Sequence, residues 1–443
     1  MIGGNSFKEP PKWLLVNKLF NSGDDIPVGS NNNGDKYIAA CFNEENTKLF
    51  GVAEEDDPVS AQGAVYESRL IDGLWTEVAR ITASNTSGTP DSFGYYDDGT
   101  TSNNRKTSVA SVGNLLFVGA PKNIINGADA GCVYVFESSS LGWQEVQVLT
   151  ASGDLNPQGD KFGACVRVSV DGTRLFVGSP QDEELGKGFG SIYVFHSSSS
   201  GWEQVQKVNG ANNSREGSTF AINASGTKIL GGGIVNKIGF YESGSSGFVR
   251  TQTLTGPDFR FGISVSISSD EKKLAVGRIG LVPGTTNPGT VHIYESGSSG
   301  WQETQQLGPV SVTGSNPINP DNDYYNTFGQ NVSLISRTTG ASTEYLLCVG
   351  AQRYGATNDI SLPSSANETV NRGAVFIYKD TGSGFIQHQQ IIPEEAGSSK
   401  GDYYGLTVAL ATDFSSLAVG SYLDSQDGSR AGSIYTYKWS DEY

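Results

Sequence analysis

The chain has 443 residues, a formal net charge of −17 and a pI near 4.6. Such a negative field repels phosphate backbones and anionic lipid headgroups, so we expect neither nucleic-acid binding nor membrane insertion. With 57 Gly, 16 Pro and 36% hydrophobic residues, among them much Val and Tyr, the composition instead indicates short β-strands joined by Gly-rich turns.

The first segment with a strand pattern is KWLLVNKLF, residues 12–20, which alternates bulky and polar side chains. It resembles the end of the units that follow, such as GWQEVQVL at residues 142–149. The chain shows neither a signal-peptide core nor the roughly 18 apolar residues of a membrane span. A cytoplasmic location, a particle assembled inside the cell and a removed leader all stay open, and we favour an extracellular surface or a virion.

A repeating unit is clearest at residues 159–208. Four alternating segments follow one another there, separated by turn residues: FGACVRVSV, RLFVGS, GSIYVFHS and GWEQVQKV. Alternation with a period of two, interrupted by turn chemistry, predicts an antiparallel four-stranded meander.

The same order of segments recurs along the whole chain. The fourth segment opens on an aromatic residue each time: Trp75, Trp143, Trp202, Phe248, Trp301 and Phe385. We predict an all-β chain of one domain, residues 1–443, folded as a seven-bladed β-propeller of four-stranded antiparallel blades. The predicted blades are 34–83, 91–150, 159–208, 215–255, 258–307, 324–392 and 401–438. A solenoid or a row of sandwiches is the alternative.

The seventh unit ends after its third strand, near Lys438. The missing fourth strand stands at the other end of the chain, because residues 13–20 have its pattern and Trp13 precedes Trp75 by about one repeat. We therefore predict that residues 13–20 join the last blade and close the ring.

Two short motifs recur at fixed places in the unit. The first is Phe-Gly, at Phe93-Gly94, Phe162-Gly163, Phe261-Gly262 and Phe328-Gly329, with Tyr404-Gly405 as a variant. The second is Gly119-Ala120-Pro121, with variants at Gly178, Gly350 and Gly420. Together they resemble the FG-GAP repeat of integrin α-subunit propellers and of bacterial and algal surface proteins. The resemblance covers almost the whole chain and implies a seven-bladed propeller used in adhesion or protein recognition.

In that family an acid-rich calcium loop often lies between the two motifs. The corresponding segments here are SVDGT (169–173), NASGT (223–227), SSDEK (268–272) and TDFSS (412–416), with one or two acids each. Calcium needs more converging oxygens, so we carry over no metal site. Acids gather in other loops, and weak cation binding at Asp424 and Asp427 stays an alternative to a solvated loop.

The sequence offers little chemistry for catalysis. The four cysteines lie singly in apolar runs, and the three histidines, His196, His292 and His388, belong to different units. We find no nucleophile elbow and no phosphate loop, so we expect no enzyme and no cofactor. A glycosidase or lyase working in the central channel is the remaining catalytic hypothesis, and it requires paired carboxylates there.

Our leading interpretation is a non-enzymatic module that binds protein or glycan at a surface. Long loops on a rigid scaffold usually carry function, which points to residues 84–107 and 308–326. Tyr95, Tyr96, Tyr324 and Tyr325 are the candidate binding residues, with coverage of the loop backbone as the plainer interpretation. A structural component of a virion or a cell-surface appendage is the alternative.

Overall fold

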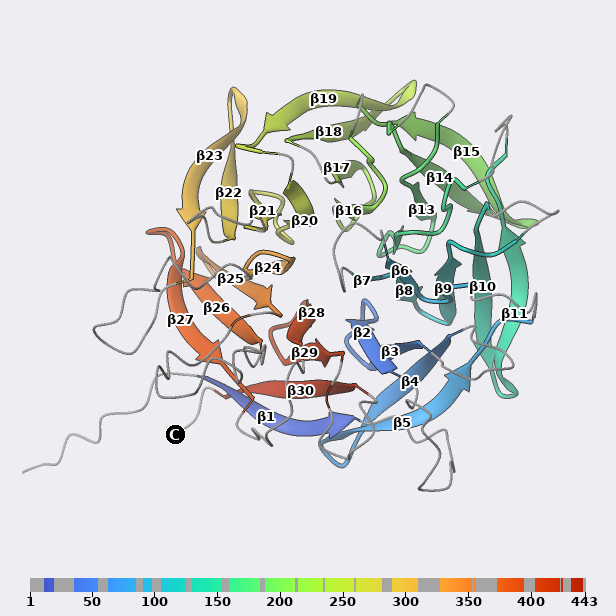
Figure 1. The fold of residues 1–443 in the computed structure, drawn as a ribbon, viewed down its shortest axis with the longest axis horizontal. Coiled ribbons are helices and arrows are strands. Elements are labelled where there is room, and N and C mark those ends of the chain that lie inside the picture. Colours follow the sequence, from blue (N-terminus) through green and yellow to red (C-terminus); the bar gives the residue numbers. More distant parts are fainter. Residues whose placement is uncertain are drawn as a thin grey trace, which may run out of the picture.

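The computed structural model describes residues 12–19, 36–54, 63–84, 91–97, 105–124, 130–152, 159–183, 188–211, 214–233, 236–258, 260–280, 289–309, 327–352, 354, 373–393, 403–422, 424 and 432–440. Seven four-stranded antiparallel sheets stand around a central axis as the blades of a propeller (Figure 1). The fold class predicted from the sequence is confirmed. No helix occurs among the described residues, and so none that could cross a membrane.

The first three blades take their strands in chain order. Blade 1 is β2 (Lys36–Phe42), β3 (Lys48–Glu54), β4 (Ala64–Ile71) and β5 (Leu74–Ile81). Blade 2 is β8 (Val109–Val112), β9 (Leu115–Ala120), β10 (Cys132–Ser139) and β11 (Gly142–Leu149), preceded by a two-stranded sheet of β6 (Tyr95–Asp97) and β7 (Arg105–Thr107). Blade 3 is β12 (Val166–Val168), β13 (Arg174–Ser179), β14 (Ser191–Ser198) and β15 (Gly201–Asn209).

The next three blades follow the same order. Blade 4 is β16 (Thr219–Ile222), β17 (Lys228–Gly232), β18 (Lys237–Gly244) and β19 (Gly247–Thr255). Blade 5 is β20 (Phe261–Ile267), β21 (Lys273–Arg278), β22 (Thr290–Gly297) and β23 (Gly300–Leu307). Blade 6 is β24 (Asn331–Thr339), β25 (Ser342–Ala351), β26 (Ala374–Asp380) and β27 (Ile386–Ile391).

Blade 7 combines both ends of the chain. Its strands are β28 (Tyr404–Leu410), β29 (Ser416–Ser421), β30 (Ser433–Ser440) and, outermost, β1 (Lys12–Leu19). β1 runs antiparallel to β30 with Trp13 opposite Trp439 and Leu19 opposite Ile434. The N-terminal strand therefore closes the ring, as its sequence pattern predicted, and Figure 1 shows the first and last strands side by side.

The hydrophobic core lies between neighbouring blades. Inner strands are buried on both faces, as in Val133, Tyr134 and Val135 of β10, each at most 1% exposed. In blades 2 to 4 the aromatic residue that opens the outer strand packs on the second strand of the blade before it. The rings of Phe117 and Trp202, for example, meet edge to face, 5.0 Å apart. Burial of both sheet faces explains why bulky residues occupy consecutive positions in the third segment of each repeat.

The two recurring glycine motifs meet across the same boundaries. A Cβ atom added to Gly119 of β9 would lie 2.0 Å from the carbonyl oxygen of Gly163, the Phe-Gly glycine of the next blade. Gly163 itself has a φ of +94°, a backbone conformation that residues other than glycine rarely adopt. The same approach recurs at Gly178 with Gly217 and at Gly277 with Gly329. The motif thus permits backbone-to-backbone packing of adjacent blades.

Side-chain amides connect the outer strands. Gln147 of β11 accepts a hydrogen bond from the backbone N–H of Trp202 and donates one to its carbonyl oxygen, at 2.9 and 3.0 Å. We call this arrangement an amide clamp. Further clamps join Gln206 to Phe248, Gln252 to Trp301, Gln305 to Phe385, Gln389 to Trp13 and Asn17 to Trp75. In each of the six outer strands that carry a clamp, a β-bulge directly precedes the clamp position.

Candidate functional site

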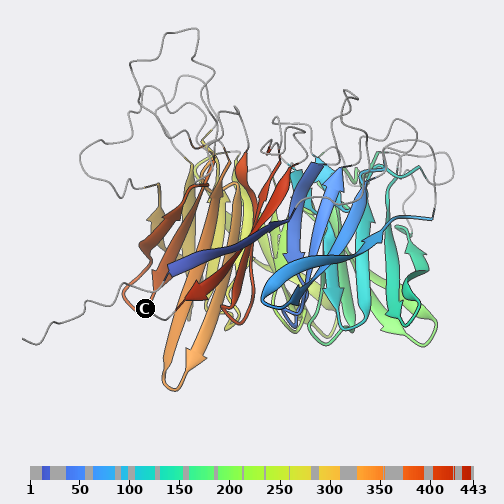
Figure 2. The ribbon, with the colours of Figure 1, turned by 90° about the horizontal axis from the view of Figure 1, so that it is seen from below.

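The two faces of the disc differ in how their strands are connected. On one face, which we call the hairpin face, the third and fourth strands of a blade are joined by tight turns, such as Asp72-Gly73 between β4 and β5, both with positive φ. On the opposite face, the connection face, β23 ends at Leu307 before β24 begins at Asn331, and β25 ends at Ala351 before β26 begins at Ala374. Figure 2 shows the strand ends that flank these long connections on the same side of the disc.

The candidate binding tyrosines are only partly visible. Tyr324 and Tyr325 lie outside the described residues, as does most of the segment 308–326. Tyr95 and Tyr96 lie in β6, where pairing with β7 leaves them 5% and 3% exposed. The Tyr95 ring belongs to the core between blades 1 and 2, and burial raises the pKa of its hydroxyl. These two rings offer little contact area, and a binding role for the four tyrosines stays a prediction.

A polar cluster around Glu54, at the end of β3, links three blades. Its carboxylate accepts hydrogen bonds from the hydroxyls of Tyr95 at 3.2 Å and Tyr422 at 3.3 Å. The Arg105 guanidinium of β7 lies 2.8 Å from the same carboxylate and 4.2 Å from the centre of the Tyr422 ring. Because Arg105 also lines the central channel, this cluster fixes the β6–β7 sheet beside the channel mouth.

The central channel has a volume of about 510 Å³ and is lined by the innermost strands of all seven blades. Many of its side chains are small or hydroxylated, for example Ala110, Ser264 and Thr407, and others are aliphatic, such as Val265. Among the described lining residues Glu44 carries the carboxylate; burial and the neighbouring Glu45 raise its pKa, and Arg167 lowers it in part. A second carboxylate, which glycoside hydrolysis requires, is not among the described residues of this lining.

Cys41 also lines the channel without the properties of a nucleophile. Burial raises the pKa of its thiol to about 12, and the nearby Arg167 lowers it only in part. Reactive cysteines are instead exposed and have a depressed pKa, so Cys41 is an inert thiol at neutral pH.

Asp424, one of the two acids considered for cation binding, has its carboxylate engaged by protein groups. Its Oδ2 atom lies 2.7 Å from the ammonium of Lys18 and accepts hydrogen bonds from Ser433 and Tyr435, both at 2.6 Å. Burial acts to raise the pKa of Asp424, but these partners lower it below its ordinary value. Asp427 lies outside the described residues, and within those no cluster of three potential metal ligands occurs.

Blade 3 repeats this arrangement. Asp182 lies 2.7 Å from Lys207 and accepts a hydrogen bond from Tyr193 at 2.9 Å. Tyr193 pairs with Lys207 across β14 and β15, as Tyr435 pairs with Lys18 across β30 and β1. The N-terminal strand β1 therefore makes the same charged contacts as β15, the outer strand of an internal blade.

The segments at the family's calcium positions are hairpin turns held by their own side chains. The side-chain oxygen of Asn223 accepts hydrogen bonds from the backbone N–H groups of Thr227 and Lys228, each at 2.8 Å. In the corresponding turn of blade 3, Asp171 accepts hydrogen bonds from Ser169 and Thr173. Oxygens that could face a cation are therefore used to close the turn.

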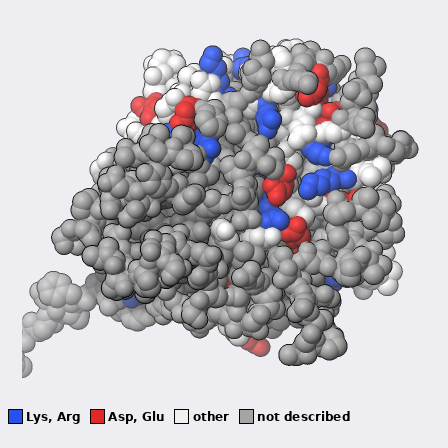
Figure 3. Space-filling model, in the orientation of Figure 1, with Lys and Arg blue, Asp and Glu red and all other residues white. Residues whose placement is uncertain are grey.

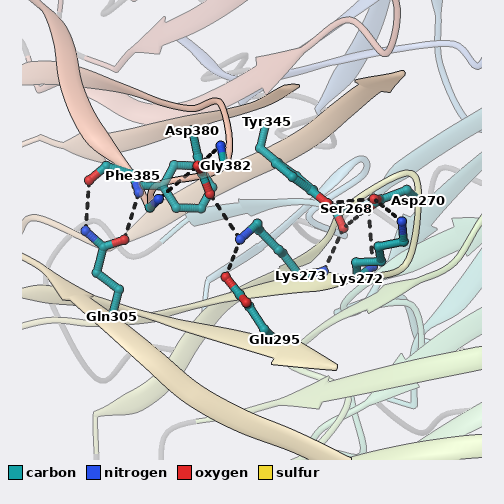
Figure 4. Close-up of polar contacts among 11 residues, drawn as sticks. Ser268, Asp270, Lys272, Lys273, Glu295, Gln305, Tyr345, Asp380, Gly382 and Phe385 are labelled. Atoms are coloured by element: carbon teal, nitrogen blue, oxygen red, sulfur yellow. Dashed lines mark hydrogen bonds and ion pairs between the residues drawn. The ribbon is translucent and has the colours of Figure 1, made fainter. Parts of the chain in front are cut away.

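A charged cluster between blades 5 and 6 was not predicted from the sequence. Lys273, at the start of β21, contacts Glu295 of its own blade and lies 3.0 Å from Asp380 of blade 6 (Figure 4). The Tyr345 ring lies 4.8 Å from the same ammonium, and the Tyr345 hydroxyl donates to Asp270 at 2.7 Å. The lysine at the start of the second strand was the sequence feature that could have indicated this cluster. Its partners Glu295 and Asp380 could not be identified from the sequence, because they lie far from Lys273 in the chain.

The histidines do not come together. His292 lies in β22 between Glu303, at 2.9 Å, and Thr290, at 3.2 Å, and its ring packs edge to face on Phe261. The His388 ring lies beside that of Trp439 in β30, and His196 of β14 pairs with Arg174 of β13. On the face shown in Figure 3, the described basic and acidic side chains are interspersed rather than gathered by sign.

Comparison with known proteins supports the resemblance seen in the motifs. The FG-GAP repeat model matches residues 143–195 and 386–437. Each match begins in the outer strand of one blade, β11 or β27, and ends in the third strand of the next, β14 or β30. None of the curated proteins compared with the chain matches it significantly.

Proposed function

From a seven-bladed β-propeller that carries FG-GAP repeats, we infer a non-enzymatic interaction module. We propose that it binds protein or glycan through its connection face, and that it does so at an extracellular surface or on a particle. The described residues give the disc rigidity through clamps and backbone packing, while the binding chemistry belongs to the long connections of the connection face.

The observation that carries this proposal is that the connections between strands are long on one face of the disc and short on the other. Hairpins on one face are short and hydrogen-bonded to the next blade, as at Asn46 with Thr412 and Asp270 with Ser336. The other face holds the long connections, including those between Leu307 and Asn331 and between Ala351 and Ala374. Long loops are tolerated where they do not disturb the core, and long loops on a rigid scaffold usually carry the binding residues.

A pair of matched variants tests the assignment of the face. One variant replaces residues 310–326 by a short Gly-Ser turn, and its control replaces Ser199 and Ser200, in the β14–β15 turn of the hairpin face, by Gly. Binding of each to arrays of glycans and to intact cells or particles of the source is compared with that of the parent chain. We expect at least a tenfold loss for the first variant and none for the control.

Binding at the parent level by the 310–326 variant would rule out this connection as a binding element, and loss by the control alone would place the contact on the hairpin face. Melting curves of the two proteins show whether either change has disturbed the propeller. Release of glycan fragments from any array position would contradict the non-enzymatic assignment.

A further inference from the structure

Three charged groups meet where blades 5 and 6 pack together. The Lys273 ammonium lies 3.0 Å from Oδ2 of Asp380, and it also contacts the Glu295 carboxylate (Figure 4). The side chains of Lys273 and Asp380 are 10% and 1% exposed, whereas that of Glu295 is 44% exposed. An amine and a carboxyl carbon are thus held together where water has little access, and a second acid that is partly open to solvent contacts the amine.

We propose that Lys273 and Asp380 condense to form an isopeptide bond that joins blades 5 and 6 covalently. Holding two reacting groups in contact gives effective concentrations of roughly 10⁵ M or more, which removes much of the entropic barrier to amide formation. The reaction needs no external oxidant or cofactor, because an ammonium and a carboxylate contain all the atoms of an amide and one water molecule.

Glu295 moves one proton in this reaction, once the N–C bond has formed. Before that, the Lys273 ammonium gives one proton to Oδ2 of Asp380, 3.0 Å away, which leaves a neutral amine beside a neutral carboxylic acid. The nitrogen attacks Cγ of Asp380, and the N–C bond forms. Glu295 then takes a second proton from the nitrogen and passes it to the Oδ2 hydroxyl, so that the Cγ–Oδ2 bond breaks and water leaves.

The other carboxyl oxygen of Asp380 already faces hydrogen-bond donors. Oδ1 accepts hydrogen bonds from the backbone N–H groups of Gly382, at 2.7 Å, and Gly384, at 3.0 Å. In the tetrahedral intermediate this oxygen carries the negative charge, and two fixed donors stabilise it as an oxyanion hole does. Both donors come from the turn that follows β26, so their positions are set by the backbone.

The resting state before reaction is an ion pair. Burial lowers the pKa of Lys273, but Glu295 and Asp380 raise it above its usual value. Burial raises the pKa of Asp380, but the Gly382 N–H and Lys273 bring it below its usual value. The neutral pair must therefore form from this ion pair before the attack, and removal of two buried charges favours the product.

Two other buried lysine–aspartate pairs serve as internal comparisons. In Lys207–Asp182 and Lys18–Asp424 the distance is 2.7 Å in each, but the aspartate accepts a hydrogen bond from a tyrosine hydroxyl, Tyr193 or Tyr435. That hydroxyl occupies Oδ2, the oxygen that would have to take the proton and leave, whereas the donors to Asp380 face Oδ1. We expect these two pairs to stay uncondensed.

Mass spectrometry of the intact, folded full-length chain tests the proposal. We expect a mass lower than that of the sequence by one water molecule, and a branched proteolytic peptide that contains both Lys273 and Asp380. The variants K273R and E295Q should have their full masses. K272R changes the neighbouring lysine, which is 66% exposed, and should still lose one water.

A wild-type chain that keeps its full mass after prolonged incubation in the folded state overturns the proposal. So does a water loss that maps to one of the Asp-Gly pairs, Asp72-Gly73, Asp98-Gly99, Asp171-Gly172 or Asp427-Gly428, where succinimide formation removes the same mass. Cross-linking that persists in E295Q would remove Glu295 from the reaction and contradict the proton-transfer step. The wild-type result stands on its own if a variant fails to fold.

Discussion

The side-chain amide of Gln389 in blade 6 holds both backbone polar atoms of Trp13, accepting from its N–H at 2.8 Å and donating to its carbonyl oxygen at 3.2 Å. On the other side of the same strand, Asn17 holds Trp75 of blade 1 in the same way. β1 is therefore clamped to both neighbouring blades as well as paired with β30. Each contact is one that an internal outer strand also makes.

Removal of residues 1–20 should destabilise the propeller by more than about 4 kcal/mol, because it strips a full ladder from β30 and the buried Trp13 ring from the core. It also exposes an unpaired strand edge that promotes aggregation. Urea unfolding and light scattering measure the two effects. Removal of residues 1–11, which leaves β1 in place, is the control and should have little effect; similar melting of both truncated chains would contradict the closure.

An amide clamp should contribute measurably to stability. Q206A removes the hydrogen bonds to the N–H and carbonyl oxygen of Phe248, at 2.8 and 3.0 Å, and should cost about 1–3 kcal/mol because half-buried backbone groups lose their partners. Q144A, at an exposed position of β11, should change stability by less than about 0.5 kcal/mol. Equal effects of the two substitutions in urea unfolding would show that the clamps are incidental.

The glycine of the second motif should tolerate no side chain. In G119A the new methyl carbon would lie 2.0 Å from the carbonyl oxygen of Gly163, so the two blades must separate, at a cost of about 1–3 kcal/mol or more. G308A is the control, because a Cβ atom there meets nothing within 4 Å. A thermal melt of G119A that coincides with that of G308A would mean that the blades adjust freely at this boundary.

The Lys18–Asp424 pair should make stability depend on pH. The pKa of Asp424 is lower in the folded chain than in the unfolded one, so its contribution is present above the unfolded value and is lost as pH falls below about 4. D424N should cost about 3 kcal/mol at neutral pH, since it removes the carboxylate charge that lies 2.7 Å from the buried Lys18 ammonium. Unfolding of both proteins from pH 7 to pH 3 should show the difference shrinking in acid; a constant difference would exclude this linkage.

The fold was predictable because its signals are local and repeated. Alternation in segments such as RLFVGS, and turns such as Asp72-Gly73, specify strands and hairpins without reference to distant residues. The closing strand was predictable because residues 12–20 carry a complete outer-strand pattern. The clamps also leave a sequence pattern, because a Gln or Asn stands four residues after Trp13, Trp143 and other opening aromatics. That pattern does not reveal the hydrogen bonds, because their partners belong to the neighbouring blade.

The candidate site was less predictable for physical reasons. Tyr95 and Tyr96 sit in a loop rich in polar residues, yet pairing of β6 with β7 turns them into the core. Asp424 looks like a solvated loop acid until Lys18, at the opposite end of the chain, comes beside it. Likewise Lys273 and Asp380 come together only through the packing of two blades. Contacts between residues so distant in sequence leave no periodic signature.

The register of β1 on β30 places Lys12 opposite Ser440, so the two ends of the described chain leave the disc at the same point. A force that pulled these ends apart would load the ladder one residue pair at a time, from Lys12–Ser440 towards Leu19–Ile434, rather than all pairs at once. A ring that resists thermal opening through many simultaneous bonds would therefore unzip under a modest mechanical load. A force applied to any other part of the disc would instead have to disrupt a complete four-stranded blade.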